Sequence, residues 1–298
     1  MEIAVSGTSG LIGSALVSSL STAGHRVARL VRTPPAAGSI DIYWDPAKAY
    51  VDTTQLSGKS AVVHLAGETI AQRWTPEAKR RIHSSRVLGT QLLSEAIRQL
   101  AEPPQVLISA SAIGYYGDRG EEILREDNMP GKGFLADICR DWEAATEPAS
   151  RAGIRVVHLR IGIVLSDQGG ALAKMLLPFR MGAGGVIGSG RQYMSWIALD
   201  DLLAAIRHII QTPSIQGAVN AVAPRPVTNR EFTKTLGKVL SRPTIAPLPA
   251  FAVRLMFGQM GEELLLASQR VEPARLKASG FSFRFPELEA ALRQAIGR

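Results

Sequence analysis

The feature that most constrains the fold of this chain is a set of three glycines within its first thirteen residues. The apolar, β-prone run 3–5 precedes Gly7, Gly10 and Gly13, and a helical pattern of apolar residues begins at Leu11. Glycines at a strand-to-helix turn permit a tight turn, a close approach of backbone to a pyrophosphate, and close packing of the helix on the strand. The helix N-terminus adds free N–H groups and the positive end of its dipole. The pattern therefore predicts a dinucleotide-binding turn, and the alternative is a glycine-rich turn that binds nothing.

The residue after the next predicted strand, at 26–31, indicates which dinucleotide fits. An Asp or Glu at this position would bind the ribose 2′-hydroxyl of NAD, but the chain has Arg32. A guanidinium is always charged and can bind two phosphate oxygens at once, so Arg32 suits the 2′-phosphate of NADP. NADP is therefore preferred as the cofactor, and a solvated loop charge is the alternative for Arg32.

Composition narrows the class of protein. The 298 residues are 46% hydrophobic, which suits one large α/β domain with a smaller appendage, and no apolar run is long enough to span a membrane. The formal net charge is +8, but no basic run carries interleaved aromatic residues, so we expect no nucleic-acid partner. The single cysteine, Cys139, excludes an intrachain disulfide and, with no signal-peptide pattern, favours a cytoplasmic protein. We assign no metal ligands.

Alternating strand and helix patterns predict an α/β fold, a Rossmann-type doubly wound parallel sheet with right-handed crossovers. Further strands are expected at 61–67, 105–109, 155–165 and 218–223, the third of them broken by Arg160 and Gly162. We place an NADP-binding domain at 1–242 and a small, mainly helical module on the substrate side at 243–298. Within the domain, 182–242 is the expected substrate-side segment, and its glycine-rich part is expected to be mobile.

Several predicted helices begin with capping residues. Thr75 begins a helix that extends to about residue 100, and Thr228 with Glu231 forms a capping box. Asp200 and Asp201 are expected to cap a helix that ends near residue 210. Other helices are expected at 134–152, 250–257, 262–268 and 286–296.

Polar side chains follow the predicted strands at the edge where a ligand would bind. Small residues in Leu65–Gly67, after a buried strand, would let the adenine and ribose come close. Ser109 and Ser111 end the next strand, and Tyr115 and Tyr116 follow them. A serine can hydrogen-bond a carbonyl and a tyrosine can transfer a proton, so Ser111, Tyr115 and Tyr116 are the candidate catalytic residues.

Four other polar residues have two readings each. His64 lies inside an apolar strand, which favours a satisfied core histidine over a catalytic one. Arg160 also lies in an apolar run and needs a partner, because an unpaired buried charge is costly. It either faces the cleft or forms a structural ion pair. Arg81 and Arg86 either reach the cofactor phosphates or belong to a solvated helix face.

A set of motifs spread along the chain points to one family. They are Gly7–Gly13, Leu65–Glu68, Ser111–Gly117, Trp142-Glu143, Leu177–Phe179, Gly188–Gln192, Ser195–Ile197, Gly280-Phe281 and Phe285–Leu288. With these motifs the chain resembles the extended short-chain dehydrogenase/reductase superfamily, in its NAD-dependent epimerase/dehydratase branch. Within that branch it is most similar to the YfcH-like epimerase-family proteins, which carry a C-terminal module of unknown function. The resemblance covers essentially the whole chain.

The resemblance implies NADP binding, and it extends the residue set reached above. The expected cofactor residues are Gly7, Thr8, Ser9, Gly10, Leu11, Ile12, Gly13, Val31, Arg32, Leu65, Ala66, Gly67, Arg81, Arg86, Ser109 and Arg160. The glycines and Arg32 follow from their chemistry, whereas Val31, Arg81, Arg86 and Arg160 rest mainly on similarity.

One departure from the family pattern bears on catalysis. Active members of the superfamily use a Tyr-x-x-x-Lys pair on the helix after the serine strand, where the lysine lowers the pKa of the tyrosine. In this chain, alignment on Glu143 puts Leu135 and Cys139 at those positions. Neither side chain can do that work, so Tyr115 or Tyr116 would have to supply the proton.

Two functions follow from these residues. The first is an NADP-dependent oxidoreductase or epimerase that transfers a hydride to or from a small molecule, with a nucleotide sugar as the usual substrate of the superfamily. The second is an NADP-binding sensor or scaffold without turnover, which binds a partner protein. The apolar helices after residue 249 either finish the core, which is the default, or form a homodimer surface.

Overall fold

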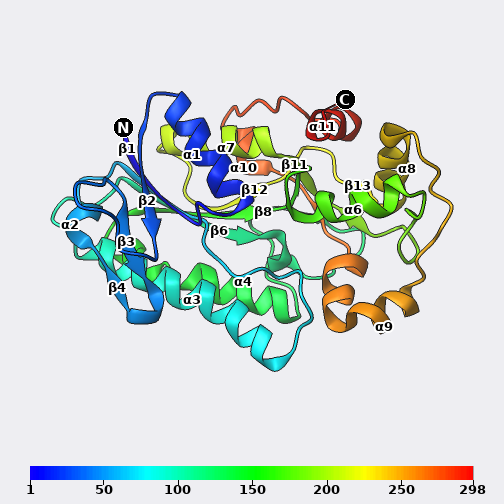
Figure 1. Ribbon diagram of the computed structural model, residues 1–298, viewed down its shortest axis with the longest axis horizontal. Helices are drawn as coiled ribbons and strands as arrows, with labels where there is room; N and C mark the ends of the chain where they lie inside the picture. Colours follow the sequence, from blue (N-terminus) through cyan, green and yellow to red (C-terminus); the bar gives the residue numbers. More distant parts are fainter. Residues whose placement is uncertain (298) are drawn as a thin grey trace.

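An eight-stranded sheet organises the molecule, as seen in the computed structural model, which describes residues 1–297 (Figure 1). The strand order is β12-β8-β6-β5-β1-β2-β3-β4, and every neighbouring pair is parallel except β3 with β4. The strands are β1 (Glu2–Ser6), β2 (Arg26–Val31), β3 (Ile42–Asp45), β4 (Tyr50–Val51), β5 (Ala61–His64), β6 (Val106–Ala112), β8 (Arg155–Ile161) and β12 (Gly217–Ala221). The order turns back at β1, which lies between β2 and β5, so the switch point lies at the carboxyl end of β1.

Helices cover both faces of the sheet, because alternate strand residues point to opposite sides. On one face, Ile3 and Val5 pack in a core with α1 (Leu11–Thr22) and α7 (Leu199–Gln211). On the other face, Ala4 packs in a core with residues of three helices. These helices are α2 (Thr53–Leu56), α3 (Pro76–Arg98) and α5 (Glu147–Arg151). In Figure 1, α1 and α7 lie above the sheet, and α3 lies below it with α4 (Phe134–Ala144). The doubly wound fold is confirmed.

A second group of short strands and helices extends the molecule beyond β8 and β12. It contains the strand pairs β9 (Ile163–Leu165) with β11 (Trp196–Ala198) and β10 (Tyr193–Met194) with β13 (Val227–Thr228). The helices α6 (Gly170–Arg180), α8 (Asn229–Leu240) and α11 (Leu288–Ala295) pack there around the buried Trp196 and Phe232. Because Leu292 of α11 belongs to this core, residues after 243 share an apolar core with the rest of the chain.

The segment after residue 243 is mainly helical. It contains α9 (Ala250–Gly261), a π-helical turn η3 (Glu262–Leu266), β14 (Arg270–Val271), α10 (Ala274–Ala278) and α11. β14 pairs with β7 (Ile123–Leu124) in a separate two-stranded sheet, so the segment also contacts the chain between β6 and α4. The expectation that its apolar residues finish the core is wrong for three of them. Phe251, Leu255 and Met256 are 71%, 85% and 64% exposed, because α9 buries only the face that carries Val253.

Local sequence signals gave most helix ends and missed some. Thr75 caps α3, and Thr228 with Glu231 forms the predicted capping box of α8. The predicted helix 134–152 is two helices, α4 and α5. Asp200 and Asp201 do not cap α7, whose N-cap is Ala198. The Asp201 carboxylate instead accepts hydrogen bonds from the N–H groups of residues 284 and 285, at 2.8 and 2.9 Å, and so anchors the chain ahead of α11.

Within residues 1–297, no helix is long and apolar enough to cross a membrane. The short elements not yet given are the 3-10 turns η1 (Pro46–Lys48) and η2 (Ile113–Tyr116).

Candidate functional site

The three glycines of the turn after β1 are required for different reasons, since two of them are needed for packing within the protein and one leaves open space. Gly7 has φ of +69°, and a Cβ on it would lie 2.7 Å from the backbone of Leu65. A Cβ on Gly13 would lie 2.2 Å from the carbonyl oxygen of Gly7, so the protein itself requires both glycines. Gly10 differs, because it is exposed and a Cβ there would meet only the Gly7 oxygen, at 3.3 Å. The absence of a side chain at Gly10 therefore leaves space that the protein does not use.

The N-terminus of α1 faces this space with free N–H groups. Gly10 is the N-cap and offers no side chain, and the first turn of α1 carries no acidic residue. Thr8 is half-buried and Ser9 is exposed beside it. A twelve-residue helix with an uncapped N-terminus attracts an anion through its N–H groups and its dipole. The turn thus has the shape and charge of a phosphate site.

Arg32 stands at the end of β2, the strand next to β1. Its side chain is exposed, and it forms no ion pair with any residue between 1 and 297. Its neighbour along the strand, Arg29, is instead bound to Asp41, and hydrogen bonding by that carboxylate raises the pKa of Arg29. Arg32 is therefore the guanidinium at this strand end that is free to take an anionic ligand, and the half-buried Val31 precedes it.

Arg86 of α3 lies on the other side of the switch point, against the segment that follows β5. Its Cζ would lie 3.2 Å from a Cβ on Gly67, and it stands 5.1 Å from the centre of the Trp142 ring. It donates a hydrogen bond to the carbonyl of Ile82 at 3.1 Å and has no carboxylate partner in the described chain. Burial lowers the pKa of Arg86. Arg86 is half-buried and forms no ion pair with a carboxylate of residues 1–297, which favours an anionic ligand. Arg81 is exposed and binds the side chain of Gln72 instead.

His64 is a core residue, as its strand position indicated, but it is only partly satisfied, because its buried Nε2 has no hydrogen-bond partner within residues 1–297. It is fully buried, and its Nδ1 lies 2.7 Å from the hydroxyl of Ser6, which also accepts a hydrogen bond from the N–H of Leu65. Burial lowers the pKa of His64 to about 4. Ser109, which pairs with His64 in the sheet, is also buried, and its side chain makes only a long contact with a backbone carbonyl. Neither side chain is exposed to a ligand.

Ser111 belongs to a buried polar network that Glu143 and Arg160 organise. The Ser111 hydroxyl donates to Glu143 Oε1 at 2.7 Å, and the Arg160 guanidinium donates to both oxygens of Glu143, at 2.8 and 2.9 Å. Of the two readings of Arg160, the structure therefore has the ion pair, and the side chain is only 4% exposed. Burial would lower the pKa of Arg160, but Glu143 raises it above its ordinary value. Arg160 is thus committed to the protein and not to a cofactor phosphate.

The two tyrosines of the 3-10 turn after β6 have different surroundings. Tyr116 is fully buried, and its hydroxyl donates to the side chain of Asn220 at 2.7 Å and accepts from Arg160 at 2.9 Å. Burial raises the pKa of Tyr116 to about 12. Tyr116 therefore does not fit the role of a proton donor to a ligand. Tyr115 is half-buried, its ring stacks 3.5 Å from the Arg160 guanidinium, and its hydroxyl has no hydrogen-bond partner within residues 1–297. Of the pair, only Tyr115 keeps a free hydroxyl.

The helix on which active members of the superfamily carry the Tyr-x-x-x-Lys pair has buried packing residues at those positions in this chain. Leu135 and Cys139 of α4 are buried, and both lie beside the Cα of Gly114, where a Cβ would be 3.2 Å from Leu135 and 3.8 Å from Cys139 Sγ. Burial raises the pKa of Cys139 to about 11, so its thiol stays neutral. The positions that would hold a tyrosine and a lysine are thus filled by groups that cannot exchange protons.

The C-terminal segment holds the first turn of α4. The carboxylate of Glu263 accepts hydrogen bonds from the N–H groups of Phe134 and Leu135, at 3.1 and 2.9 Å. Gln259 donates to the same carboxylate at 2.7 Å and accepts from Lys79 of α3. No sequence signal near α4 indicated this contact, because its partner lies more than a hundred residues away.

The fold and this site define an α/β protein of the dinucleotide-binding type, whose switch point carries a glycine turn with an uncapped helix N-terminus and unpaired guanidinium groups. Comparison with known proteins gives the family. The model of the NAD dependent epimerase/dehydratase family matches residues 3–221, and that of a domain of unknown function, DUF1731, matches residues 248–295. The chain belongs to the NAD-dependent epimerase/dehydratase family, within the extended short-chain dehydrogenase/reductases.

Relatives match the whole chain. Epimerase family protein Mb2239 of Mycobacterium bovis is 44% identical, over 99% of this chain and 98% of that protein. The crystal structure of the human epimerase family protein SDR39U1 with NADPH has a TM-score of 0.90 at 35% identity and covers both chains completely. A structure of a nucleoside-diphosphate sugar epimerase from Corynebacterium glutamicum has a TM-score of 0.83 at 39% identity, over 100% of this chain and 58% of that one.

Proposed function

We propose that this protein binds NADP(H) and transfers a hydride to or from a small molecule, as an oxidoreductase or an epimerase. The observation that carries the proposal is the uncapped N-terminus of α1 beside Gly10, with the unpaired Arg32 at the end of the adjacent strand. The human relative crystallised with NADPH supports the choice of NADP over NAD.

Different residues at the switch point would bind different parts of the cofactor. The turn from Gly7 to Gly13 would hold the pyrophosphate through backbone N–H groups, and Arg32 would hold the 2′-phosphate with a bidentate, charge-assisted contact. Arg86 would supply a counter-charge to an anionic group next to Gly67. The cofactor supplies the hydride chemistry, and the protein orients it. Tyr115 would exchange the proton with the substrate, because its hydroxyl is the free one of the pair.

A second function, NADP binding without turnover, has its own support. The hydroxyl protons of Ser111 and Tyr116 are donated to Glu143 and Asn220, so neither is available to polarise a substrate carbonyl. In addition, no proton-exchanging group stands at Leu135 or Cys139. This reading predicts cofactor-dependent binding of a partner protein and no hydride exchange.

The deciding experiment is a titration of the purified protein with NADPH and NADH, followed by nicotinamide fluorescence. We expect NADPH to bind more tightly, and Arg32→Glu to remove that preference by weakening NADPH at least about tenfold, since hydrogen bonds to charged groups contribute about 1.5–3 kcal/mol. Arg225→Glu is the matched control, because Arg225 is an exposed arginine beyond β12, at the other edge of the sheet. Absence of binding by either nucleotide would refute both functions.

A further inference from the structure

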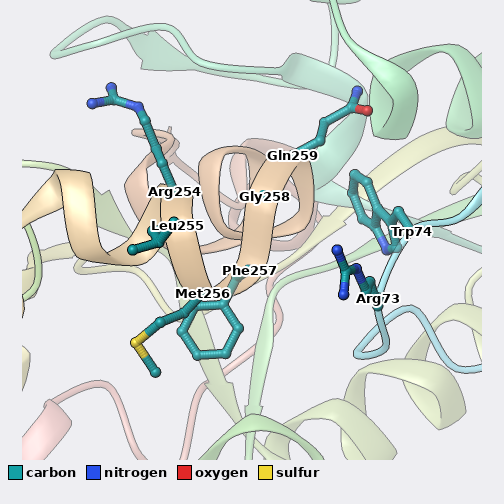
Figure 2. A pocket seen from close by; sticks show the side chains of 8 residues that line it. All are labelled: Arg73, Trp74, Arg254, Leu255, Met256, Phe257, Gly258 and Gln259. Carbon is teal, nitrogen blue, oxygen red and sulfur yellow. The ribbon is translucent and has the colours of Figure 1, made fainter.

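A groove between the β5–α3 segment and α9 lies outside the dinucleotide cleft. It encloses about 340 Å³, and none of the expected cofactor residues lines it. Figure 2 shows its walls: Arg73 and Trp74 approach from the segment before α3 and face the last turns of α9. The lining residues are Arg73, Trp74, Arg254, Leu255, Met256, Phe257, Gly258 and Gln259.

One wall presents a positive charge beside a fixed aromatic ring. The Arg73 side chain is exposed and makes no ion pair or hydrogen bond with any other side chain of residues 1–297. Trp74 is held by its Nε1, which donates to the carbonyl of Ile70 at 2.9 Å, and by an edge-to-face contact with Phe134 at 4.9 Å. The Trp74 indole is therefore oriented before any ligand binds, whereas the Arg73 guanidinium keeps its hydrogen-bond donors free for a ligand.

The opposite wall is apolar and open. Phe257 is half-buried, and Gly258 has φ of +56°, with nothing within 4 Å of the position of a Cβ. In Figure 2, Arg254 and Leu255 extend from α9 on the side away from Arg73 and Trp74. Arg254 also lies 3.4 Å from the carboxylate of Glu262, so its charge has a partner. Arg73 is thus the cation that the groove offers to a ligand.

The chemistry of this groove selects an organic anion with a planar, apolar body. A guanidinium binds a carboxylate, sulfonate or phosphate through two parallel hydrogen bonds, and aromatic walls bury a flat apolar group. A ligand with charge alone would leave Trp74 and Phe257 unused, and a neutral apolar ligand would leave Arg73 without a partner.

We propose that this groove binds a small organic anion with a planar, apolar body. Trp74 packs on Phe134 at the start of α4, and the adjacent Leu135 lies against Gly114, the neighbour of Tyr115. Packed side chains therefore lie between the groove and Tyr115, and the groove is a site of its own.

The test uses a matched pair of probes, the anionic 8-anilinonaphthalene-1-sulfonate and the neutral N-phenyl-1-naphthylamine, each titrated by fluorescence. We expect Arg73→Gln to weaken the anionic probe about tenfold, as loss of a charge-assisted contact does, and to leave the neutral probe unchanged. Trp74→Leu should weaken both probes. Arg98→Gln at the far end of α3 and Phe251→Ser on the exposed face of α9 are the controls, because neither residue lines the groove, and both should bind the probes as the unaltered protein does.

The inference is overturned if Arg73→Gln binds the anionic probe with unaltered affinity. It is overturned equally if Phe251→Ser abolishes binding, because the probe would then lie on the exposed face of α9 outside the groove. NADPH titration of the same variants should match the unaltered protein, which shows that the fold is intact. If the unaltered protein binds the anionic probe through Arg73 but does not bind NADPH, the proposed function fails while the anion groove stands.

Discussion

The Arg160 guanidinium of β8 is bound to the Glu143 carboxylate of α4 by two hydrogen bonds, from Nε at 2.8 Å and from Nη2 at 2.9 Å. The pair ties the helix that packs under the site to the sheet that carries Ser111. Both side chains are almost excluded from water, with 4% and 11% of their surface exposed. Loss of one partner would therefore leave an uncompensated charge in a region of low dielectric.

We expect Arg160→Leu to lower the free energy of unfolding by about 3–5 kcal/mol, the usual effect of removing one partner of a buried pair. Equilibrium unfolding in urea measures this. The control is Arg293→Leu, which removes an exposed pair with Glu289 on α11 and should cost less than about 0.5 kcal/mol. The double variant Glu143→Leu with Arg160→Leu should recover part of the loss. Equal effects of Arg160→Leu and Arg293→Leu would contradict the prediction.

Gly10 and Gly13 should respond differently to alanine. Gly10→Ala should fold normally, since its backbone is extended and its Cβ would meet a single atom at 3.3 Å, yet it should weaken NADPH binding by filling the ligand's space. Gly13→Ala should lower the midpoint of thermal unfolding, since its Cβ would lie 2.2 Å from the Gly7 oxygen. Fluorescence titration and thermal melts compare the two. A Gly10→Ala variant with unchanged NADPH affinity would count against a phosphate at this turn.

Replacing the two tyrosines one at a time should affect different properties, the activity for Tyr115 and the stability for Tyr116. Tyr115→Phe should lower kcat by about 100-fold or more for a carbonyl compound that the protein reduces with NADPH, as loss of a general acid does, with little change in stability. Tyr116→Phe should leave Asn220 without its donor and cost about 1 kcal/mol of stability. Steady-state kinetics and urea unfolding test the two variants together. If Tyr116→Phe proves the more damaging to kcat, the assignment of Tyr115 is wrong.

His64 should make the stability depend on pH. Its pKa is lowered from 6.5 to about 4 in the folded protein, so between those values the unfolded chain binds a proton that the folded chain does not. This contribution is complete above pH 6.5 and is lost as the pH falls toward 4. It amounts to about 2 kcal/mol between pH 8 and pH 5. His64→Gln should flatten urea-derived stability over this range, and an unchanged slope in that variant would contradict the prediction.

The regular part of the fold could be predicted because its signals are local. The three glycines, the Thr75 cap and the Thr228 capping box each act within a few residues, and the structure has all of them. The predicted break at Gly162 is confirmed, but its physical reason is a contact far along the chain, since a Cβ there would lie 2.7 Å from the Ser195 oxygen. The predicted break at Arg160 is wrong, because Arg160 lies within β8. The assignment of Asp201 as a cap failed because its carboxylate binds backbone N–H groups from a segment far along the chain.

The candidate site could be predicted only in part, for the same reason. A residue such as Arg32 can be predicted from the sequence, because it directly follows a predicted strand. The commitment of Arg160, Tyr116 and Ser111 to one buried network depends on Glu143 and Asn220, which the sheet brings together from separate strands and a helix. Side-chain type alone does not show which hydroxyl is free and which one donates a hydrogen bond within the protein.

The contact between Glu263 and the first turn of α4 also has a consequence for synthesis of the chain. A growing polypeptide emerges N-terminus first, so the residues of α4 leave the ribosome well before Glu263 does. During that interval the N–H groups of Phe134 and Leu135 have only water as a partner, and the nascent helix lacks its anchor. A truncated product that ends near residue 242 would keep the dinucleotide turn but have this helix end unfinished.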